Sequence, residues 1–395
     1  MPKPSSIDLT QIGKLAQVAI CLFFFLLVIV PHVMELSGRG GNTASVEKRE
    51  IAKAPVPGLF FSSFSEWSRQ FERYYSDSFG LRDRLILWNG LLRLRGFDDF
   101  QSSTTLVVGR EGWLFFANEN VLEDYMNVIP FKSEDLEKMG RILEERRVWL
   151  ERKGVKLFIL VAPNKHTIYS EYLPRNIHKL GKESRLDQAK TYLERCYPKL
   201  EFLDVRETLF NAKRTQRLYY KTDTHWNSYG AFIAYGELMK RIGLHFPAAK
   251  RYSLDDFTLN VQEYRAGSLA RMLSLSDRLV EETVTLVPKF DHRARDVESP
   301  PANSLHRKGG ISVREVDDPH LPKALIFHDS FTLALMPFLS ESFRRSVYAR
   351  TSDFLPELIE RENPDIVIIE CVERYIHRLS MENPPEVTAT LHGLR

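Results

Sequence analysis

Three near-continuous runs of aliphatic residues stand out along the chain, at 155–163, 323–329 and 365–372. Each run is short and bounded by polar residues, which favours a strand over a buried helix. Strands that are apolar at almost every position are typical of parallel sheets covered on both faces. Because helical patterns separate the three runs, the sequence predicts an α/β fold with a mainly parallel sheet.

The helical patterns differ in how clearly their ends are marked. Residues 133–154 show the clearest limits, with Ser133 as the predicted N-cap and Gly154 as the residue that ends the helix. The stretch 244–322 shows a weaker pattern of apolar positions and is rich in polar residues, so we interpret it as an insertion. Further helices are predicted at 62–95, 184–196 and 227–242, and shorter strands at 106–116 and 200–205.

The N-terminal segment 15–34 is apolar and contains no Asp, Glu, Lys or Arg. About 20 such residues suffice to cross a hydrocarbon core as a helix, and Lys3 and Lys14 ahead of it favour a cytoplasmic N-terminus. A cleaved signal peptide is the alternative, although its apolar region is normally shorter. The sequence therefore predicts a cytoplasmic tail (1–14), one transmembrane helix (15–34), a linker (35–57) and an exported domain (58–395).

Composition narrows the function classes only slightly. The 55 basic and 52 acidic side chains give a formal net charge of +3, which lacks the basic excess typical of a nucleic-acid-binding protein. Outside the apolar N-terminal segment there are two cysteines, Cys196 and Cys371. They could form one disulfide in an oxidising compartment, and the sequence leaves open whether they meet.

Ser330 directly follows the aliphatic run 323–329. In a doubly wound sheet, functional groups gather beyond the carboxyl ends of the strands. A serine at a strand-to-helix turn can expose its Oγ while backbone N–H groups face an incoming oxyanion. The alternative is that Ser330 only caps the helix that follows.

Asp223 and His225 are the candidates for the partners of such a serine. A serine nucleophile needs a general base, and the base needs a carboxylate that orients it. The alternatives are a surface turn before a helix, or a metal site completed by His328 and Asp329. Because paired cysteines and His-x-x-x-His spacings are absent from the sequence, we predict neither a metal nor another cofactor.

Asn164 follows the aliphatic run 155–163 and is the third polar group at a predicted strand end. Its side-chain amide could donate to an oxyanion together with the backbone N–H of Ser330, and one such donor contributes roughly 3–4 kcal/mol in acyl-transfer enzymes. The alternative is an ordinary turn in which the side chain bonds to nearby backbone.

The candidate residues lie in or near seven sequence segments. In its segments and their order, the chain resembles one known family, the SGNH-hydrolase-like proteins of polysaccharide O-acetylation, of the AlgJ/AlgX-like type. The Asp-x-His-Trp motif precedes the serine motif, which is the permuted order of this family. His328 departs from the family pattern, which has glycine there, and Ser268 stands where an acidic residue is often found. The segments are FERYYSDSFGLRDRL (71–85), GREGWLFF (109–116), VAPNKHTIYSEYLP (161–174), YYKTDTHWNSYGA (219–231), GSLARML (267–273), HDSF (328–331) and VIIECVERYI (367–376).

This resemblance implies a fold, a reaction and a location. The fold is an SGNH-like α/β/α sandwich, and the reaction is acetyl transfer to a polysaccharide through Ser330, His225 and Asp223. The location is the extracytoplasmic side of a bacterial inner membrane, beside a membrane-bound O-acyltransferase that supplies the acyl group. Because only about 20 residues follow the last matching segment, too few for an independent domain, we expect the anchored, single-domain type rather than the two-domain secreted type.

Four further residues are candidates for substrate binding, and two other functions stay open. The aromatic candidates could stack on a sugar, although core packing is the more common use of such side chains. A carbohydrate acetylesterase would share the same triad, and a non-catalytic polysaccharide-binding protein would not need it. The four residues are Tyr219, Tyr220, Trp226 and Arg374.

Overall fold

The three aliphatic runs form neighbouring strands of one sheet, β3 (Lys156–Ala162), β9 (Lys323–Phe327) and β11 (Ile366–Val372). In the computed structural model, β11 lies between the other two and pairs with both in parallel. Alternate residues of β3 belong to two separate hydrophobic clusters, with Phe158 in one and Ile159 in the other. These strands are therefore buried on both faces, which explains why their sequences do not alternate. The structure describes residues 9–36, 55, 64–78, 105–265, 267–273, 275–276, 278–298 and 310–392.

Within the described residues this sheet has seven strands and is mixed, because two antiparallel strands extend its parallel part. Its order is β4-β3-β11-β9-β10-β8-β7, and the first five strands are parallel. β8 pairs antiparallel with β10, and β7 pairs antiparallel with β8. These last two strands come from the stretch that we expected to be an insertion. The four strands not yet given are β4 (Glu201–Asp204), β7 (Arg295–Val297), β8 (Ile311–Glu315) and β10 (Arg345–Ala349).

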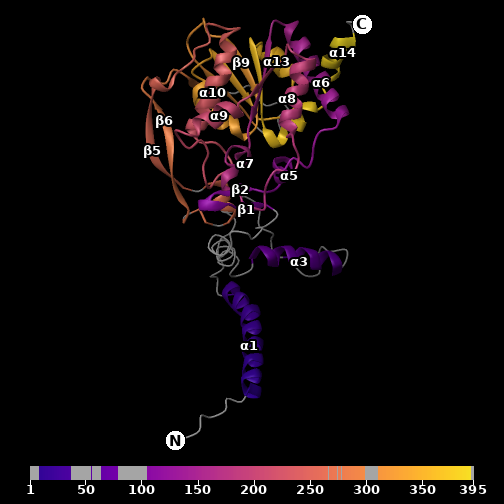
Figure 1. Ribbon diagram of the computed structural model, residues 1–395, viewed down its shortest axis with the longest axis vertical. Helices are drawn as coiled ribbons and strands as arrows, with labels where there is room; N and C mark the ends of the chain where they lie inside the picture. The colour runs from indigo at the N-terminus through magenta and orange to yellow at the C-terminus, as the bar shows by residue number, and fades with distance from the viewer. Residues whose placement is uncertain are drawn as a thin grey trace. The chain divides into compact units, whose positions relative to one another are not determined.

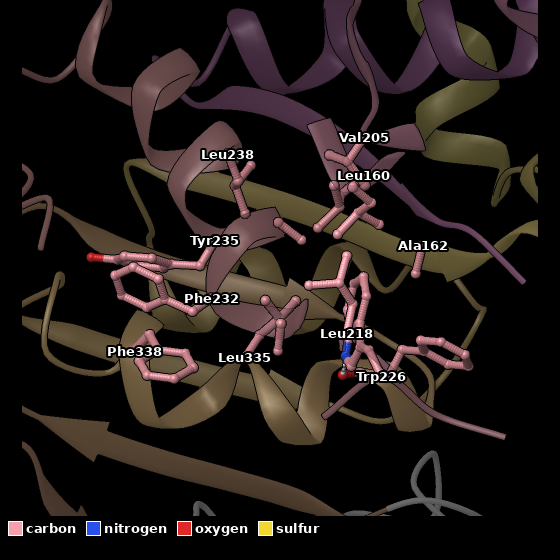
Figure 2. Packing of buried hydrophobic residues seen from close by; sticks show 14 of the residues in the cluster. Leu160, Ala162, Val205, Leu218, Trp226, Phe232, Tyr235, Leu238, Leu335 and Phe338 are labelled. Carbon is pink, nitrogen blue, oxygen red and sulfur yellow. Dashed lines mark hydrogen bonds between the residues drawn. The ribbon is translucent and has the colours of Figure 1, made fainter. Parts of the chain in front are cut away.

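Helices cover both faces of the sheet and make a three-layered α/β/α arrangement (Figure 1). One face is covered by α9 (Arg206–Ala212), α10 (Ser228–Gly243) and α12 (Met336–Leu339). Figure 2 shows this packing, with Leu238 of α10 near Leu160 of β3. The other face is covered by α6 (Ser133–Glu151), α8 (Arg185–Cys196), α13 (Pro356–Glu362) and α14 (Pro385–His392).

The ends of the helices follow local hydrogen bonding. Asn227 is the N-cap of α10, and its side chain accepts from the backbone N–H of Gly230 at 2.9 Å. The prediction that Ser133 caps α6 is wrong by one residue, because Ser133 is its first helical residue and Lys132 takes the N-cap place. There the side chain of Asp135 accepts from the backbone N–H of Lys132 at 3.0 Å, so an acidic residue of the first turn closes this end.

Two small sheets lie beside the main one. β1 (Leu106–Val108) and β2 (Leu114–Phe116) are antiparallel, and so are β5 (Phe257–Arg265) and β6 (Val280–Pro288). The remaining short helices are η1 (Arg110–Gly112), α5 (Val121–Tyr125), α7 (Lys165–Ile168), η2 (Ser170–Tyr172), η3 (Leu254–Asp256), α11 (Ser268–Met272), η5 (Ser330–Ala334) and η6 (Glu373–Ser380).

The chain divides into two compact units, Met1–Gly96 with Arg271–Ser276, and Phe97–Ala270 with Asp277–Arg395. The first unit contains α1 (Leu9–Leu36) and α3 (Phe64–Ser78). The predicted transmembrane segment 15–34 lies within α1, and none of the helices in the described part of the chain is both long and apolar enough to cross a membrane. Most of the predicted linker 35–57 and residues 79–95 of the predicted helix 62–95 lie outside the described residues.

The two cysteines of the folded part are not paired. Cys371 is buried in the central strand β11, whereas Cys196 is exposed at the last residue of α8, and both are free thiols. The disulfide that the sequence left open is therefore not formed.

Candidate active site

Asp223, His225 and Ser330 meet at the carboxyl end of the parallel strands. Ser330 is the first residue of η5, and only His328 and Asp329 separate it from the last residue of β9. The loop between α9 and α10 carries the other two residues. The Nε2 atom of His225 lies 2.8 Å from the Oγ of Ser330, and its Nδ1 lies 2.6 Å from Oδ1 of Asp223. The three side chains therefore form a continuous hydrogen-bonded chain from carboxylate to hydroxyl.

Asp223 is buried and is held in its charged form. Its Oδ1 also accepts from the backbone N–H of His225 at 3.1 Å, while Oδ2 accepts from the backbone N–H of Ser268 at 2.7 Å and from the hydroxyl of Tyr264 at 3.3 Å. Burial by itself raises the pKa of Asp223, but the hydrogen bonds and charge of His225 and the Ser268 N–H outweigh it and hold the pKa well below its ordinary value. A permanently charged carboxylate fixes the imidazole with Nδ1–H toward Asp223 and Nε2 toward the serine.

The turn before Ser330 is fixed by Asp329 rather than by the serine. One carboxylate oxygen of Asp329 accepts from the backbone N–H of Phe331 at 2.8 Å, and the other accepts from that of Val372 at 2.7 Å. Asp329 is thus the N-cap of η5 and ties it to the end of β11. Because Asp329 caps η5, the Oγ of Ser330 is not used for capping and lies within hydrogen-bond distance of His225.

Glu370 of β11 accepts hydrogen bonds from the same turn. Its Oε2 accepts from the backbone N–H of Asp329 at 3.2 Å and from the hydroxyl of Thr332 at 2.8 Å. Complete burial, together with the nearby charge of Asp329, raises the pKa of Glu370 well above its ordinary value. The neutral acid is therefore favoured, which avoids a second uncompensated charge beneath the serine.

Two of the predicted sugar-stacking residues are packing residues instead. The side chains of Tyr219 and Trp226 are fully buried, so neither ring can lie against a sugar. The hydroxyl of Tyr219 donates to the carbonyl of Pro163 at 2.6 Å, and Nε1 of Trp226 donates to the carbonyl of Phe331 at 3.0 Å. Figure 2 shows Trp226 within the cluster of buried hydrophobic residues. Trp226 thus joins the loop of His225 to the turn of Ser330.

Tyr220 differs from these two, because its side chain is partly exposed. Its ring stacks on that of Tyr264, with 4.0 Å between the ring centroids. Since the hydroxyl of Tyr264 reaches Asp223, this aromatic pair lies beside the acidic end of the hydrogen-bonded chain. Tyr220 stays a candidate for substrate contact.

Asn164 and Arg374 are brought together near the serine turn. Asn164 is buried two residues beyond the end of β3, and its backbone N–H donates to the carboxylate of Glu373 at 2.8 Å. Nη1 of Arg374 donates to Oδ1 of Asn164 at 3.2 Å, and the guanidinium lies 5.9 Å from the ring centre of Phe331. This contact assigns the carbonyl end of the Asn164 amide to Arg374, so the N–H end faces the opposite way. Arg374 also donates to Glu119 at 3.3 Å and is a buried, paired arginine.

The metal alternative finds little support in the arrangement of His328 and Asp329. Both carboxylate oxygens of Asp329 accept backbone N–H groups, and Nδ1 of His328 lies 2.6 Å from the carbonyl of Asp329. Burial lowers the pKa of His328, so the neutral ring is favoured. Among the residues that the structure describes, no group of three or more His, Cys, Asp or Glu side chains is placed to hold a metal ion.

Several residues that hold the site were not predicted from the sequence. Glu281 of β6 accepts from the backbone N–H groups of Lys221 and Thr222, at 2.7 and 2.8 Å, directly before Asp223. Lys165 binds the same loop from the other side. The only hint of Lys165 in the sequence is a charged residue immediately after a buried strand and its terminal asparagine, which is also how an ordinary surface turn reads.

Comparison with known proteins places this site in a family. A family model described as "SGNH hydrolase-like domain, acetyltransferase AlgX" matches residues 106–350, a range that includes all three residues of the hydrogen-bonded chain. The structure resembles that of Bacillus cereus PatB1 with a TM-score of 0.50 and 17% sequence identity, over 70% of this chain and 97% of that one. At this identity the likeness supports the fold alone.

Two curated relatives are both named probable alginate O-acetylase AlgJ. The Pseudomonas aeruginosa protein is 26% identical over 238 residues, which are 58% of this chain and 55% of that protein. The Azotobacter vinelandii protein is 24% identical over 323 residues, 78% of each chain. The chain therefore spans about half the length of the first relative and more of the second. Because the family model matches more than half of its length, the chain belongs to the AlgJ/AlgX-like family of SGNH hydrolase-like proteins.

Proposed function

We propose that this protein is an O-acetyltransferase that moves acetyl groups onto a polysaccharide through an acetyl-serine at Ser330. The observation that carries the proposal is the chain of two hydrogen bonds, 2.6 and 2.8 Å long, that links Asp223, His225 and Ser330. Membership of a family whose model is named for an acetyltransferase supports the choice of reaction, and so do the names of the two relatives.

In the first half of the proposed reaction, Nε2 of His225 accepts the proton of Ser330 as Oγ attacks the acetyl carbonyl carbon of the donor. The carbonyl π-electrons move to oxygen, and the oxyanion is held by the backbone N–H of Ser330 and by the side-chain amide of Asn164. The bond to the donor oxygen then breaks, and the protonated His225 returns the proton to the leaving group. Asp223 stays ionised throughout and stabilises the imidazolium.

In the second half, a hydroxyl group of the polysaccharide takes the place of the leaving group. His225 accepts the hydroxyl proton as that oxygen attacks the acetyl-serine, and the ester bond to Ser330 breaks when the tetrahedral intermediate collapses. The proton passes from His225 back to the Oγ of Ser330, so the site returns to its starting state. If water attacks instead of a sugar, the same steps give an acetylesterase.

The surroundings of the reaction belong to the same proposal. The predicted partner is a membrane-bound O-acyltransferase that delivers the acyl group, and the predicted location is outside the cytoplasm of a bacterial cell. The acceptor is a polysaccharide, because the relatives are named for one such polymer. A fusion to alkaline phosphatase after residue 395, which is active only outside the cytoplasm, tests the location, and an inactive fusion that is made in normal amounts would contradict it.

Incubation of the purified protein with p-nitrophenyl acetate and a neutral or acidic oligosaccharide tests the reaction. We expect acetylated oligosaccharide, detected by mass spectrometry, from the wild type and none from Ser330→Ala or His225→Ala. Ser380→Ala is the matched control, because its hydroxyl bonds to the carbonyl of His377 within η6. Release of p-nitrophenol without any acetylated sugar would favour the esterase, and equal sugar acetylation by Ser330→Ala would exclude the acetyl-serine.

A further inference from the structure

Lys165 is a buried cation that is enclosed by the loop of the candidate site. It is the first residue of α7 and directly follows Asn164, and only 2% of the residue is exposed. Its Nζ donates to the backbone carbonyls of Tyr220 and Lys221, both at 3.1 Å, and of Asp223 at 2.6 Å. These three acceptors belong to the short segment that ends at the carboxylate of the site.

The ammonium group has three N–H donors, so three carbonyl acceptors use its whole capacity. A neutral amine has two donors and a lone pair, which would face one of the three carbonyl oxygens. Deprotonation of Lys165 would therefore break one hydrogen bond and introduce a repulsive contact in a site without solvent. Only the charged form donates to all three carbonyls, and it does so alongside the hydrogen bonds that Glu281 accepts from the backbone N–H groups of Lys221 and Thr222.

The surroundings of Lys165 compensate part of the cost of burying its charge. The rings of Trp113 and Phe115 lie 5.7 and 5.2 Å from Nζ, within the range of a cation–π contact. Opposite charge comes from Asp223 in the loop and from Glu281 on β6. The substitution of a residue without a positive charge would remove the donor to the carbonyls of Tyr220 and Asp223, while the carbonyl of Lys221 would keep the backbone N–H of Leu114 at 2.9 Å.

We propose that Lys165 is a positioning residue for the reaction, because its ammonium group holds the loop that aims Asp223 and His225 at Ser330. Lys165 does not contact the reacting atoms, and it acts through the three backbone carbonyls. This inference rests on the proposed function, since it assigns a role within the same reaction. It also implies that the site needs a protonated lysine and a neutral histidine at the same time.

The charges that face Lys165 decide the pH at which it loses its proton. Burial lowers its pKa most, Asp223 and Glu281 raise it, and Arg217 lowers it, with a result of about 7. The neighbouring His166 is buried and adds no charge near neutral pH, because its pKa is lowered to about 3. The ammonium form is therefore present below about pH 7 and is lost as the pH rises through that value. Positioning by Lys165 consequently predicts a loss of kcat on the alkaline side.

The test measures kcat and KM for p-nitrophenyl acetate from pH 5 to pH 9, with p-nitrophenol read at its isosbestic wavelength. We compare the wild type, Lys165→Met, Lys165→Arg and Ser330→Ala, each with its thermal midpoint. Lys213→Met is the matched control, because Lys213 also donates to a backbone carbonyl, that of Ile168 at 2.5 Å, and its other hydrogen bonds go to Glu171 rather than to the segment 220–223. Arginine keeps its charge over this range.

We expect Lys165→Met to lose kcat by about 100-fold, as for a displacement of roughly 1 Å in a catalytic group, with KM within about threefold of the wild type. We expect Lys165→Arg to recover part of this kcat and to keep it to higher pH than the wild type does. A folded Lys165→Met with the wild-type kcat, or with a change in KM alone, would overturn the proposal.

If Lys165→Met does not fold, the dependence of the wild-type kcat on pH tests the proposal instead. A fall of kcat above about pH 7 that Lys213→Met shares supports positioning by Lys165, and an unchanged kcat up to pH 9 overturns it. Failure of the proposed function itself is recognised separately, because Ser330→Ala would then retain acetyl release whatever the lysine variants do.

Discussion

Gly267 lies where the backbone of one loop touches the loop that carries Asp223, and this contact leaves no room for a side chain. A Cβ atom on Gly267 would lie 2.3 Å from the carbonyl oxygen of Thr222 and 2.4 Å from its Oγ1. Ordinary van der Waals contact for such an atom begins at 3.4 Å, so Gly267→Ala must separate the two loops by about 1 Å. The neighbour that moves is the residue immediately before Asp223.

The separation should weaken the hydrogen bond that holds the carboxylate. The backbone N–H of Ser268 donates to Asp223 at 2.7 Å, and a further 1 Å takes this pair beyond the usual limit of about 3.2 Å. The backbone N–H groups of Leu269 and Ala270 donate to the same Thr222 carbonyl, both at 3.1 Å, so the carbonyl cannot move without breaking them. We therefore expect kcat to fall by about 10- to 100-fold and the free energy of unfolding to fall by about 1–3 kcal/mol.

The assay is acetyl release from p-nitrophenyl acetate, combined with urea denaturation of each variant. Gly243→Ala is the control, since a Cβ on this last residue of α10 would meet nothing within 4 Å. We expect this control to keep both kcat and the unfolding free energy. Gly267→Ala with wild-type kcat and stability would refute the argument that the close approach of the loops positions Asp223.

Two further substitutions test other contacts of the site. Because the folded-state pKa of Asp223 is lowered, its charge stabilises the protein above about pH 4 and this contribution is lost as the pH falls. In Asp223→Asn the thermal midpoint should therefore depend less on pH at acid pH, and kcat should fall by up to about 10⁴-fold. A thermal midpoint that falls with acid as it does in the wild type would contradict the lowered pKa of Asp223. Trp226→Phe removes the donor to the carbonyl of Phe331 and should lower the unfolding free energy by about 1–3 kcal/mol, and an unchanged urea midpoint would refute this.

The central strands could be predicted from the sequence because burial on both faces leaves a clear pattern. β3, β9 and β11 fall within the three aliphatic runs, and the hairpin β1–β2 falls within 106–116. The strand β10 was missed because it reads RSVYA and is short, although its Ser346 is fully buried. β5 was missed although Phe257, Leu259 and Val261 alternate with polar residues, and of these three side chains only Phe257 is buried.

Ser330 could be predicted from its place beyond a strand, and Asp223 and His225 could be predicted from the needs of a serine nucleophile. Their supports could not, because they depend on long-range contacts. Tyr264 reaches Asp223 across 41 positions of the sequence, and Glu281 reaches Thr222 across 59. The burial of Trp226 was not predictable for a different reason, since an aromatic residue beside a catalytic motif looks the same in sequence whether it packs or meets a sugar.

The acetyl-serine at Ser330 is the central claim, and intact-mass spectrometry of the protein tests it most directly. The protein is mixed with p-nitrophenyl acetate, quenched in acid within the first turnover and digested to locate the modified peptide. The account predicts a mass gain of one acetyl group on the peptide that contains Ser330, lost on addition of an oligosaccharide acceptor and absent from Ser330→Ala. An acetyl group found on another residue, or the same gain in Ser330→Ala, would contradict it.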